Sequence, residues 1–244
     1  MRGEEIEISV VLPAHNEAER IEDAVNQTRK ALAEFASSFE IIIAEDGSTD
    51  GTDEIASRIE AENSFVKHIH SEERLGRGKA LSRAFKLATG EILAYLDVDL
   101  STDMNHLKEL INAIKEEHYD FATGSRMLKG SEVKRSFKRA ALSKVFNFLV
   151  RKILRSKISD HQCGFKSFRK ETLIPLLNEI TDEHWFWDTE MLVRAQRNSY
   201  KIKEIPVRWE DKGGAGTKVN AFKDGLTMFY KIIKLRHFLI KIKT

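Results

Sequence analysis

The stretch EILAYLDVDL, residues 91–100, begins as an apolar run and ends in two aspartates one residue apart. A short apolar run bounded by polar residues is typical of a strand buried in a sheet. Asp97 and Asp99 stand where that strand ends, and residues i and i+2 of an extended segment point the same way. Because ionised carboxylates are costly to bury without a partner, the sequence predicts that a cation or a set of donors meets this pair.

The same alternation of strand and helix continues on both sides of this stretch. Apolar runs alternate with amphipathic segments of about 10 to 20 residues, the pattern of a mostly parallel sheet with helices on both faces. Ligands of such sheets bind at the carboxyl ends of the strands, so the polar ends PAHNE, EDGSTD and DVDLS should form one site. The expected strands are 6–13, 40–46, 65–70, 91–97 and 120–125, and the expected helices are 17–35, 53–62, 78–88 and 104–117.

After Ser125 the sequence becomes basic. Residues 129–157 hold ten Lys or Arg against one acid, and residues 218–244 hold seven against one, although the net charge of the chain is only +2. This asymmetry indicates an anionic partner, either a membrane surface, a nucleic acid or phosphates, with a solvated face as the alternative. The expected elements are helices at 137–157, 188–199 and 220–243, strands at 163–170 and 200–209, and a glycine-rich loop at 212–218.

The composition excludes several classes of protein. The chain has 244 residues, of which 41% are hydrophobic and 32% charged, as in an ordinary globular protein. Its single cysteine, Cys163, excludes an internal disulfide framework and a multi-cysteine metal site, and we expect it to pack in a core. No run approaches about 18 apolar residues, so we expect no transmembrane segment and no signal peptide.

Two strand ends and one loop carry side chains suited to binding. Two hard oxygen ligands in DVD suit Mg²⁺ or Mn²⁺ together with waters and substrate phosphates, whereas a solvated turn is the alternative for D-x-D alone. Asp46, in AEDGSTDGT, could accept hydrogen bonds from a base or a ribose, or could belong to an ordinary helix cap. The loop RLGRGKA offers Arg74, Arg77 and Lys79 to an anion but matches neither the P-loop nor the G-x-G-x-x-G spacing.

Some residues with reactive or aromatic side chains have a structural explanation of equal weight. His68 and His70 alternate with other residues on one strand, which predicts surface residues and not ligands. The aromatic residues 185–187 fit a sugar or lipid groove as well as a core. Three acids could serve either in the active site or in the structure, by pairing with arginine or capping a helix. They are Asp160, Asp188 and Glu190.

Six motifs follow one another along the chain: VVLPAHNEAERI, IIIAEDGSTDGT, RLGRGKALSRAF, ATGEILAYLDVDLS, FATGSR and DHQCGFKSFRK. Their order and spacing resemble family 2 glycosyltransferases with the GT-A fold, and more narrowly the polyprenyl-phosphate sugar synthases. WFWDTEMLVRAQ, IKEIPVRWED and GTKV look closer to the dolichyl-phosphate β-glucosyltransferase branch than to dolichyl-phosphate mannose synthase. Trp209 and residues 216–218 match the last loop of that branch, while Glu45 and Thr217 replace its usual Asp and Ser.

The resemblance implies roles for individual residues. It implies that Asp97, Asp99 and Arg126 are catalytic, and that the two aspartates hold Mg²⁺ or Mn²⁺. The residues implied for the donor are Pro13, Ala14, Asn16, Glu17, Asp46, Gly76, Lys79, Asp97, Val98 and Lys218. Those implied for the acceptor phosphate are Arg126, Arg139 and Ser143, of which the last two lie at i and i+4 on one helix face.

The resemblance also implies an arrangement of the whole chain and a reaction. It implies one α/β domain over 1–244, with a nucleotide-sugar half over about 1–125, an acceptor half over about 126–218 and an amphipathic helix over 219–244. The implied reaction transfers a hexosyl group with inversion from a nucleotide sugar, UDP-glucose favoured, to a polyprenyl or dolichyl phosphate, a step in protein glycosylation. A GDP-mannose-dependent mannose synthase and a relative with a soluble or polysaccharide acceptor are the alternatives.

The basic helices predict a place for the protein. Lys and Arg flank apolar faces in 135–157 and 219–243, a pattern suited to the headgroup region of an anionic bilayer. We therefore expect a peripheral protein at the cytoplasmic face of a membrane, with room for a separate membrane-anchoring partner. A nucleic-acid binder would leave DVDLS without a use and lacks a recognisable signature, so no nucleic-acid partner is expected.

Overall fold

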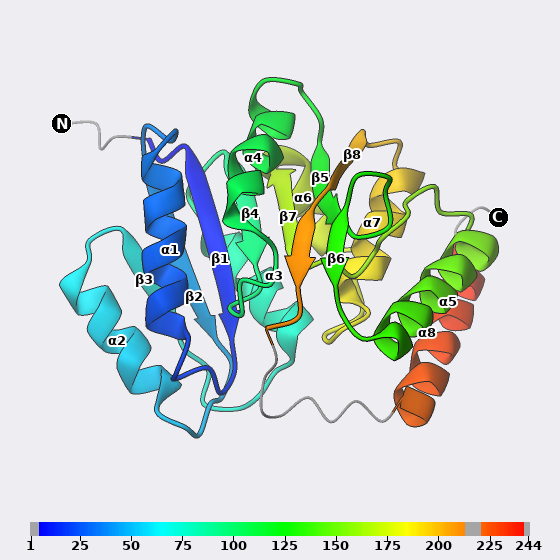
Figure 1. The fold of residues 1–244 in the computed structure, drawn as a ribbon, viewed down its shortest axis with the longest axis horizontal. Helices are drawn as coiled ribbons and strands as arrows, with labels where there is room; N and C mark the ends of the chain where they lie inside the picture. Colours follow the sequence, from blue (N-terminus) through cyan, green and yellow to red (C-terminus); the bar gives the residue numbers. More distant parts are fainter. Residues whose placement is uncertain (1–4, 213–220, 242–244) are drawn as a thin grey trace.

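The computed structural model describes residues 5–212 and 221–241, which form a twisted sheet between layers of helices (Figure 1). The main sheet has seven strands in the order β3-β2-β1-β4-β7-β5-β8. Strands β1 to β4 pair in parallel, β5 pairs in parallel with β8, and β7 runs antiparallel to both of its neighbours. The strands are β1 (Ile8–Ala14), β2 (Phe39–Glu45), β3 (Val66–Ile69), β4 (Ile92–Leu96), β5 (Phe121–Ser125), β7 (Phe165–Arg169) and β8 (Ile202–Pro206).

Helices cover both faces of this sheet because successive strand residues point to opposite sides. Val10 and Leu12 of β1 pack into one buried cluster, whereas Val11 packs into the other. The first cluster is covered by α1 (Ile21–Ala33), α2 (Thr52–Glu62) and α4 (Leu107–Lys115), which follows the short 3₁₀ turn η1 (Met104–His106). The second is covered by α3 (Arg77–Leu87), α6 (Lys170–Leu177) and α7 (Trp187–Arg197). The predicted α/β fold with a mostly parallel, helix-flanked sheet is confirmed.

A third hydrophobic cluster joins the two long basic helices to the side of the molecule. Val150 and Leu154 of α5 (Phe137–Leu154) pack with Ile232 and Leu235 of α8 (Ala221–Lys241). Beside α5, a small second sheet pairs β6 (Glu132–Lys134) in parallel with β9 (Arg208–Glu210). The predicted basic amphipathic helices after the core are therefore present.

Two features of this second half differ from the sequence prediction. The strand expected over 200–209 is divided at the buried residue Val207 into β8 and β9, which belong to different sheets. Helix α6 and strand β6 were not expected, because β6 has only three residues and α6 contains Pro175 in its last turn. Elements this short show too little periodicity for a pattern to reveal them.

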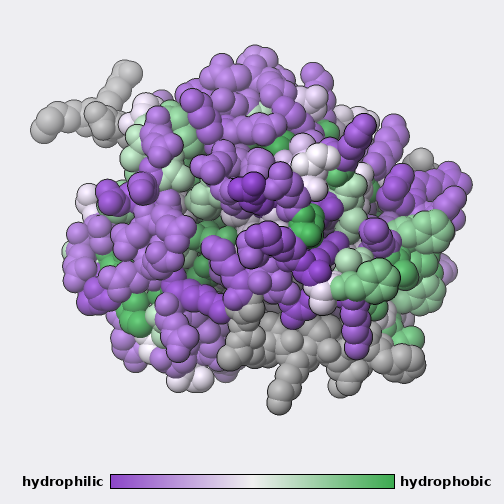
Figure 2. All heavy atoms as spheres, in the orientation of Figure 1, coloured by the Kyte–Doolittle hydropathy of each residue, from purple (hydrophilic) through white to green (hydrophobic). Residues whose placement is uncertain are grey.

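The basic helices leave many apolar side chains at the surface. Within the described ranges, no helix is both long and apolar enough to cross a membrane. Figure 2 nevertheless shows hydrophobic side chains gathered on the right, where α5 lies in Figure 1. The exposed large apolar residues of the two helices are Phe137, Leu142, Val145 and Phe148 of α5 and Leu226, Phe229, Tyr230, Phe238 and Ile240 of α8.

Candidate active site

The carboxyl ends of β1, β2 and β4 meet at one edge of the sheet, because β1 pairs in parallel with both of the others. The loops after β1 and β2 are joined directly. The backbone N–H of Asn16 donates to Ser48 Oγ at 3.0 Å, and Asn16 Oδ1 accepts from the N–H of Thr49 at 2.9 Å. Asn16 has a φ of 56°, a left-handed conformation that asparagine adopts more readily than most residues. The two loops thus form one continuous rim.

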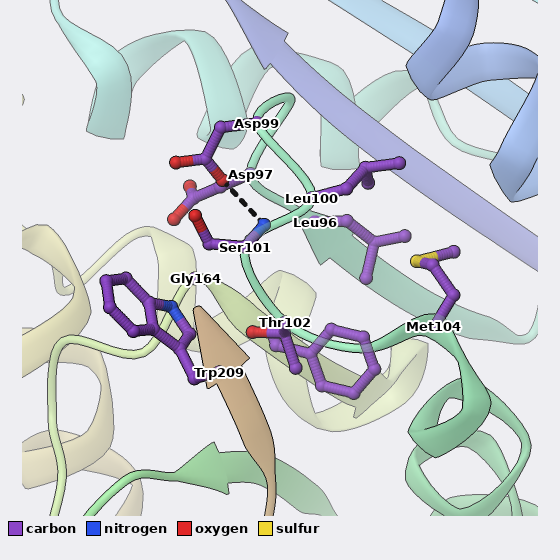
Figure 3. Close-up of a pocket in the computed structure, with 10 residues that line it drawn as sticks. Leu96, Asp97, Asp99, Leu100, Ser101, Thr102, Met104, Gly164 and Trp209 are labelled. Carbon is purple, nitrogen blue, oxygen red and sulfur yellow. Dashed lines mark hydrogen bonds between the residues drawn. The ribbon is translucent and has the colours of Figure 1, made fainter. Parts of the chain in front are cut away.

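Asp97 and Asp99 point into a pocket at the end of β4 (Figure 3). One oxygen of each carboxylate is occupied: Asp97 Oδ1 accepts from Arg77 Nη2 at 2.5 Å, and Asp99 Oδ1 accepts from the N–H of Ser101 at 2.9 Å. The second oxygen of Asp97 lies against Gly164, where any Cβ would overlap it. The other lining residues are Leu96, Leu100, Ser101, Thr102, Met104, Phe165 and Trp209.

This pocket fits a hard divalent cation. Asp97 and Asp99 each keep one carboxylate oxygen that accepts no hydrogen bond from the described residues, and the Asp97 side chain is 40% exposed. Mg²⁺ and Mn²⁺ are commonly held by one or two carboxylates, with the remaining positions left to water and phosphate. No histidine, and no cysteine, is among the described lining residues, so the donor set favours oxygen-seeking ions over zinc.

Asp97 is positioned by a network of charged side chains that includes Arg77 and the buried Asp188. Arg77 donates through Nη2 to Asp97 and through Nη1 to Asp188 Oδ2, the latter at 2.7 Å. Burial acts to raise the pKa of Asp188, but Lys166 and Arg77 outweigh it and hold that pKa below its usual value. Asp188 therefore stays ionised and shares Arg77 with Asp97. Arg77 is engaged by the protein's own carboxylates, and its expected contact with an anionic ligand stays a prediction.

Asp46 ties the next loop to the rim. Its Oδ1 accepts from the N–H of Leu75 at 2.7 Å and its Oδ2 from the N–H of Gly76 at 2.9 Å. Gly76 has a φ of 103°, and a Cβ there would overlap the ring of His184, so glycine is required. The predicted contact of Asp46 with a nucleoside stays a prediction, since each carboxylate oxygen can accept a further hydrogen bond.

The other predicted donor residues are distributed along or beside this rim. Glu17 is half-buried, and burial raises its pKa. The ammonium group of Lys79 pairs with Glu183 at 3.0 Å, and its contact with the donor stays a prediction. Lys218 lies outside the described residues. Pro13 and Ala14 end β1, and the buried Val98 separates the two aspartates.

Arg126, directly after β5, forms a second buried ion pair. Its Nε and Nη2 donate to the two oxygens of Asp160 at 2.7 and 2.9 Å, a bidentate arrangement. Burial acts to raise the pKa of Asp160, but Arg126 lowers it to about 2. The guanidinium carbon lies 5.5 Å from the ring centre of Trp209, which also lines the Asp97 pocket. The Nη1 group of Arg126 donates no hydrogen bond to the described residues and so can serve a ligand.

The residues predicted to hold the acceptor phosphate with Arg126 are arranged differently from the expectation. Arg139 Nη1 donates to Asp211 Oδ2 at 2.5 Å, and its side chain is 53% exposed. Ser143 Oγ accepts instead from Arg135 Nη1 at 3.0 Å. Arg135 Nε is buried and finds no acceptor among the described residues. Burial lowers the pKa of Arg135, and the positive charge of Arg126 lowers it further.

Sequence reasoning therefore missed Arg135. It stands just before α5, whose N-cap is Ser136, so the helical i, i+4 rule that paired Arg139 with Ser143 does not reach it. An arginine preceding a helix carries no local signal of what it will contact. Only the cluster of basic residues between 129 and 157 pointed to this region.

Most of the residues for which a structural role was one explanation are buried or paired within the protein. Phe186 and Trp187 are buried in the core, whereas Trp185 is 52% exposed. Glu190 pairs with Arg194 at 2.7 Å, a structural contact. Cys163 is fully buried, as expected, and burial raises its pKa to about 11.

The histidine prediction is wrong for one of the two residues. The His70 side chain is partly exposed, but only 5% of the His68 side chain is. Helix α2 covers it, with Ser57 Oγ lying 3.2 Å from His68 Nδ1. Strand alternation alone could not reveal this cover, because β3 is an edge strand with a helix packed beside it.

The chain is similar to known sugar-transferring proteins. The glycosyl transferase family 2 model matches residues 9–177. Glycosyltransferase AglD of Haloferax volcanii is 50% identical over 231 residues, which are 94% of this chain but only 37% of that protein's length. The dolichyl-phosphate beta-glucosyltransferases of Dictyostelium discoideum and Saccharomyces cerevisiae are 31% and 30% identical, covering 95% and 96% of this chain and 74% and 75% of their own lengths.

Solved structures share the fold at much lower identity. Glucosyl-3-phosphoglycerate synthase of Mycobacterium tuberculosis, crystallised with Mn²⁺, UDP and glucosyl-3-phosphoglycerate, superposes with a TM-score of 0.65 at 19% identity, covering 94% of this chain and 78% of that one. Mannosyl-3-phosphoglycerate synthase of Rubrobacter xylanophilus gives 0.70 at 16% identity, covering 98% and 75%. These likenesses establish the GT-A fold.

Proposed function

We propose, from the premise that this chain belongs to glycosyl transferase family 2, that it transfers glucose from UDP-glucose to the phosphate of a polyprenyl or dolichyl lipid. The main observation behind the proposal is the position of Arg126, whose guanidinium carbon lies 5.5 Å from the ring centre of Trp209, a residue that lines the pocket of Asp97 and Asp99. One half of this site suits a cation-bound diphosphate, and the other suits a second anion. The identity of about 30% to dolichyl-phosphate beta-glucosyltransferases supports this choice of donor and acceptor.

The donor half uses the rim of the sheet. Asp97 and Asp99 would hold Mg²⁺ or Mn²⁺ through their two remaining oxygens. Such an ion, when bound, neutralises the donor diphosphate and so makes it a better leaving group. Asn16, Glu17 and Asp46 would hold the nucleoside along the joined loops after β1 and β2.

The acceptor half uses the arginine pair. Arg126 is fixed by Asp160 through Nε and Nη2, which leaves Nη1 directed to a ligand. Arg135 contributes a buried Nε that has no acceptor among the described residues. A buried donor without an acceptor is costly, and two neighbouring guanidinium groups repel one another, so an anion between them would relieve both costs. A phosphate group fits this need, with Ser143 within reach of the same arginine.

The reaction requires little proton chemistry. The second ionisation of a phosphate monoester lies near pH 6, so the attacking oxygen is already anionic at neutral pH. The protein must instead align two anions that repel each other and hold the sugar between them. Arg126 and Arg135 would orient the acceptor oxygen. Trp209 lines the pocket of Asp97 and Asp99 and lies beside Arg126, which supports a role in contacting the sugar. A direct displacement inverts the anomeric carbon and gives a β-linked product from an α-linked donor.

The surface of α5 and α8 suits a lipid acceptor. Exposed aromatic and aliphatic side chains such as Phe137 and Phe148 lie on a helix that also carries Lys138, Lys144 and Arg151. Apolar side chains flanked by cations favour the headgroup region of an anionic bilayer. The same helix begins next to Arg135, so a lipid phosphate in the bilayer surface would lie close to the acceptor half.

The test supplies radiolabelled UDP-glucose, Mn²⁺ and polyprenyl phosphate, and measures label extracted into organic solvent. The proposal predicts extraction only when all three are present, and more label from UDP-glucose than from GDP-mannose. If polyprenyl phosphate is present and the label still stays in the aqueous phase, bound to a water-soluble acceptor, the lipid assignment is contradicted. A preference for GDP-mannose would contradict the donor assignment alone.

A further inference from the structure

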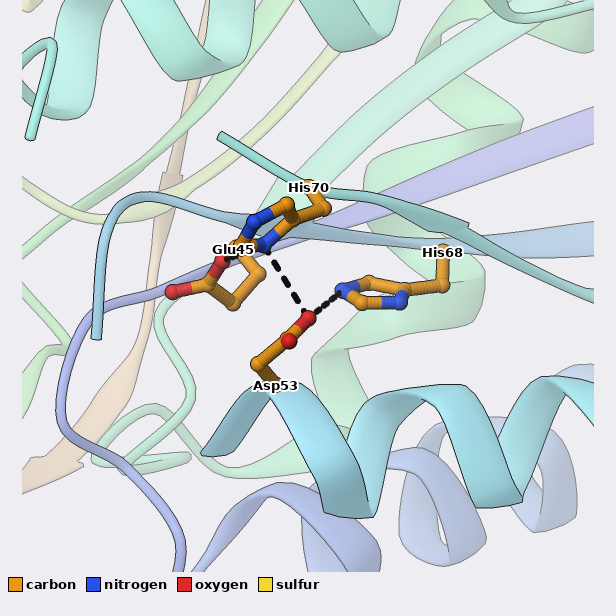
Figure 4. A group of neighbouring side chains, drawn as sticks. All are labelled: Glu45, Asp53, His68 and His70. Atoms are coloured by element: carbon orange, nitrogen blue, oxygen red, sulfur yellow. Dashed lines mark hydrogen bonds and ion pairs between the residues drawn. The ribbon is translucent and has the colours of Figure 1, made fainter. Parts of the chain in front are cut away.

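A second group of possible metal ligands lies away from the Asp97 pocket. Figure 4 shows Glu45 at the end of β2, Asp53 in the first turn of α2, His68 in β3 and His70 directly after it, all pointing toward one another. One ligand atom from each of the four lies within 4.8 Å of the others. The group therefore connects three elements that are separated in sequence.

One ring nitrogen in this group, His68 Nε2, has no hydrogen-bond partner among the residues that the structure describes. His70 Nδ1 lies 2.7 Å from Glu45 Oε2 and 3.0 Å from Asp53 Oδ1. His68 Nε2 lies 3.5 Å from Asp53 Oδ1 but makes no hydrogen bond with any described residue, although 95% of this side chain is buried and only 5% is exposed. Buried ring nitrogens are normally satisfied, so a buried nitrogen that faces the Asp53 carboxylate without a hydrogen bond points to a ligand between them.

We propose that Glu45, Asp53, His68 and His70 bind a transition-metal ion of the Zn²⁺ type. Two imidazole nitrogens with two carboxylate oxygens are a donor set that zinc accepts, whereas Mg²⁺ prefers oxygen alone. The two carboxylates also balance the charge of a divalent ion. The site is chemically different from the Asp97 pocket, whose acidic ligands come without any histidine.

The distances suit a small ion. Tetrahedral bonds of about 2.0 to 2.1 Å place neighbouring ligand atoms about 3.3 Å apart. The three measured separations of 2.7, 3.0 and 3.5 Å lie on both sides of that value. Glu45 is oriented for this role because its other oxygen accepts from the N–H of Ser48 at 2.5 Å. Binding would release any proton held on the coordinating nitrogen of His70.

The ion would act on the loop between its ligands. Glu45 and Asp53 enclose residues 46–52, the loop that carries Asp46 and is joined to Asn16. Tying both ends of this loop to β3 would stabilise it whether or not a nucleotide is bound. The site thus has a structural effect that can be measured without any assay of sugar transfer.

The test titrates Co²⁺ into a tag-free chain carrying Asp99→Asn, which disables the other proposed metal pocket. Tetrahedral Co²⁺ absorbs strongly in the visible, unlike octahedral Co²⁺. We expect uptake of about one ion per chain with that spectrum, displacement by Zn²⁺, and a higher melting temperature with Zn²⁺. His68→Gln and His70→Asn, which keep a polar atom near the original ring nitrogen, should each weaken binding at least about 100-fold.

His118→Asn is the matched control, because His118 is exposed, lies far along the chain and has a φ of 56° that asparagine tolerates. It should bind Co²⁺ like the parent. If His68→Gln fails to fold by circular dichroism, the partly exposed His70→Asn decides. A parent chain that shows no tetrahedral spectrum, or a His70→Asn chain that binds as tightly as His118→Asn, would overturn the proposal and leave a simple ion-pair cluster.

Discussion

The site contains two arginine–aspartate pairs, Arg77–Asp97 and Arg126–Asp160, in which the two partners differ in solvent exposure. In the Arg77–Asp97 pair the aspartate is 40% exposed, and one of its oxygens accepts no hydrogen bond from the part of the chain that the structure describes. Arg77 is shared with a second acid. In the Arg126–Asp160 pair the aspartate is completely buried, and Nη1 of the arginine donates to no residue within 5–212 and 221–241. In the first pair the arginine therefore supports a carboxylate, and in the second the carboxylate supports an arginine.

This reversal tells which group of each pair meets a ligand. A carboxylate that faces solvent beside a second acid can hold a cation, whereas a fully bonded carboxylate cannot. An arginine with unused donors can hold an anion, whereas one shared between two acids has its charge compensated. The two halves of the site are thus suited to ligands of opposite charge, although they use the same two residue types.

The largest expected effect comes from Asp97→Asn. It removes a proposed cation ligand but keeps an acceptor for Arg77, so the fold should survive while turnover falls by about 1,000-fold or more with Mn²⁺ present. Asp103→Asn, in the same loop with its side chain on the N–H of Asn105, is the matched control and should stay within about twofold of wild type. Near wild-type turnover by Asp97→Asn would show that the Asp97 carboxylate is not a required cation ligand.

Gly164→Ala should have the next largest effect, because a Cβ at this position overlaps the free oxygen of Asp97. The carboxylate must rotate, and misplacing a catalytic group by about 1 Å can cost about 100-fold in rate. Steady-state kinetics should show the loss mainly in kcat, with a higher Mn²⁺ requirement. Gly130→Ala is the control. A Cβ at Gly130 would meet no atom closer than a Pro206 carbon at 3.8 Å, although the φ of Gly130 is positive. Equal losses in both variants would point to general backbone strain.

Arg135→Gln and Arg139→Gln separate the observed arginine pair from the predicted one. The account expects the KM for lipid phosphate to rise about 10-fold or more in Arg135→Gln, because a charged hydrogen bond of about 1.5–3 kcal/mol is lost. Arg139 is paired at the surface with Asp211, so Arg139→Gln should raise the KM for lipid phosphate by less than about threefold. The KM for the nucleotide sugar should change little in either. The opposite ranking would restore Arg139 as the acceptor ligand.

The smallest effect is on stability and depends on pH. The pKa of Asp160 is lowered to about 2 by Arg126 against the opposing effect of burial. Its stabilising contribution is therefore complete above about pH 4 and is lost as pH falls toward 2. Urea unfolding of wild type should lose about 2 kcal/mol more than Asp160→Asn between about pH 5 and pH 2. Parallel curves for the two proteins would mean that Asp160 is not held ionised by Arg126.

The fold was largely predictable because its first half repeats one simple pattern. Apolar runs and amphipathic segments located β1 to β5 and α1 to α4 within a few residues. Strand direction was not predictable, since β7 is antiparallel and an apolar run has no direction. The break at Val207 and the short strand β6 arise from contacts between distant segments, not from local periodicity.

The candidate site was predictable where it depends on local geometry. The convergence of Asp97 and Asp99 follows from the two-residue period of an extended chain. The partners of Arg77 lie 20 and 111 positions away, and no local pattern could have shown that they are carboxylates. Arg135 and the buried His68 were missed for the same reason, because tertiary packing decides their surroundings.

The proposal that Asp97 and Asp99 hold a divalent cation for the donor diphosphate is tested most directly by electron paramagnetic resonance. The experiment follows free Mn²⁺ during titration with UDP. The signal of the hydrated ion disappears when it binds the protein or UDP alone. The UDP-dependent loss that remains after subtraction of the loss in protein-free UDP counts the ions held by the donor half. The account predicts uptake of about one ion per chain by wild type and Asp103→Asn, and none by Asp97→Asn. Undiminished UDP-dependent uptake by Asp97→Asn would contradict it.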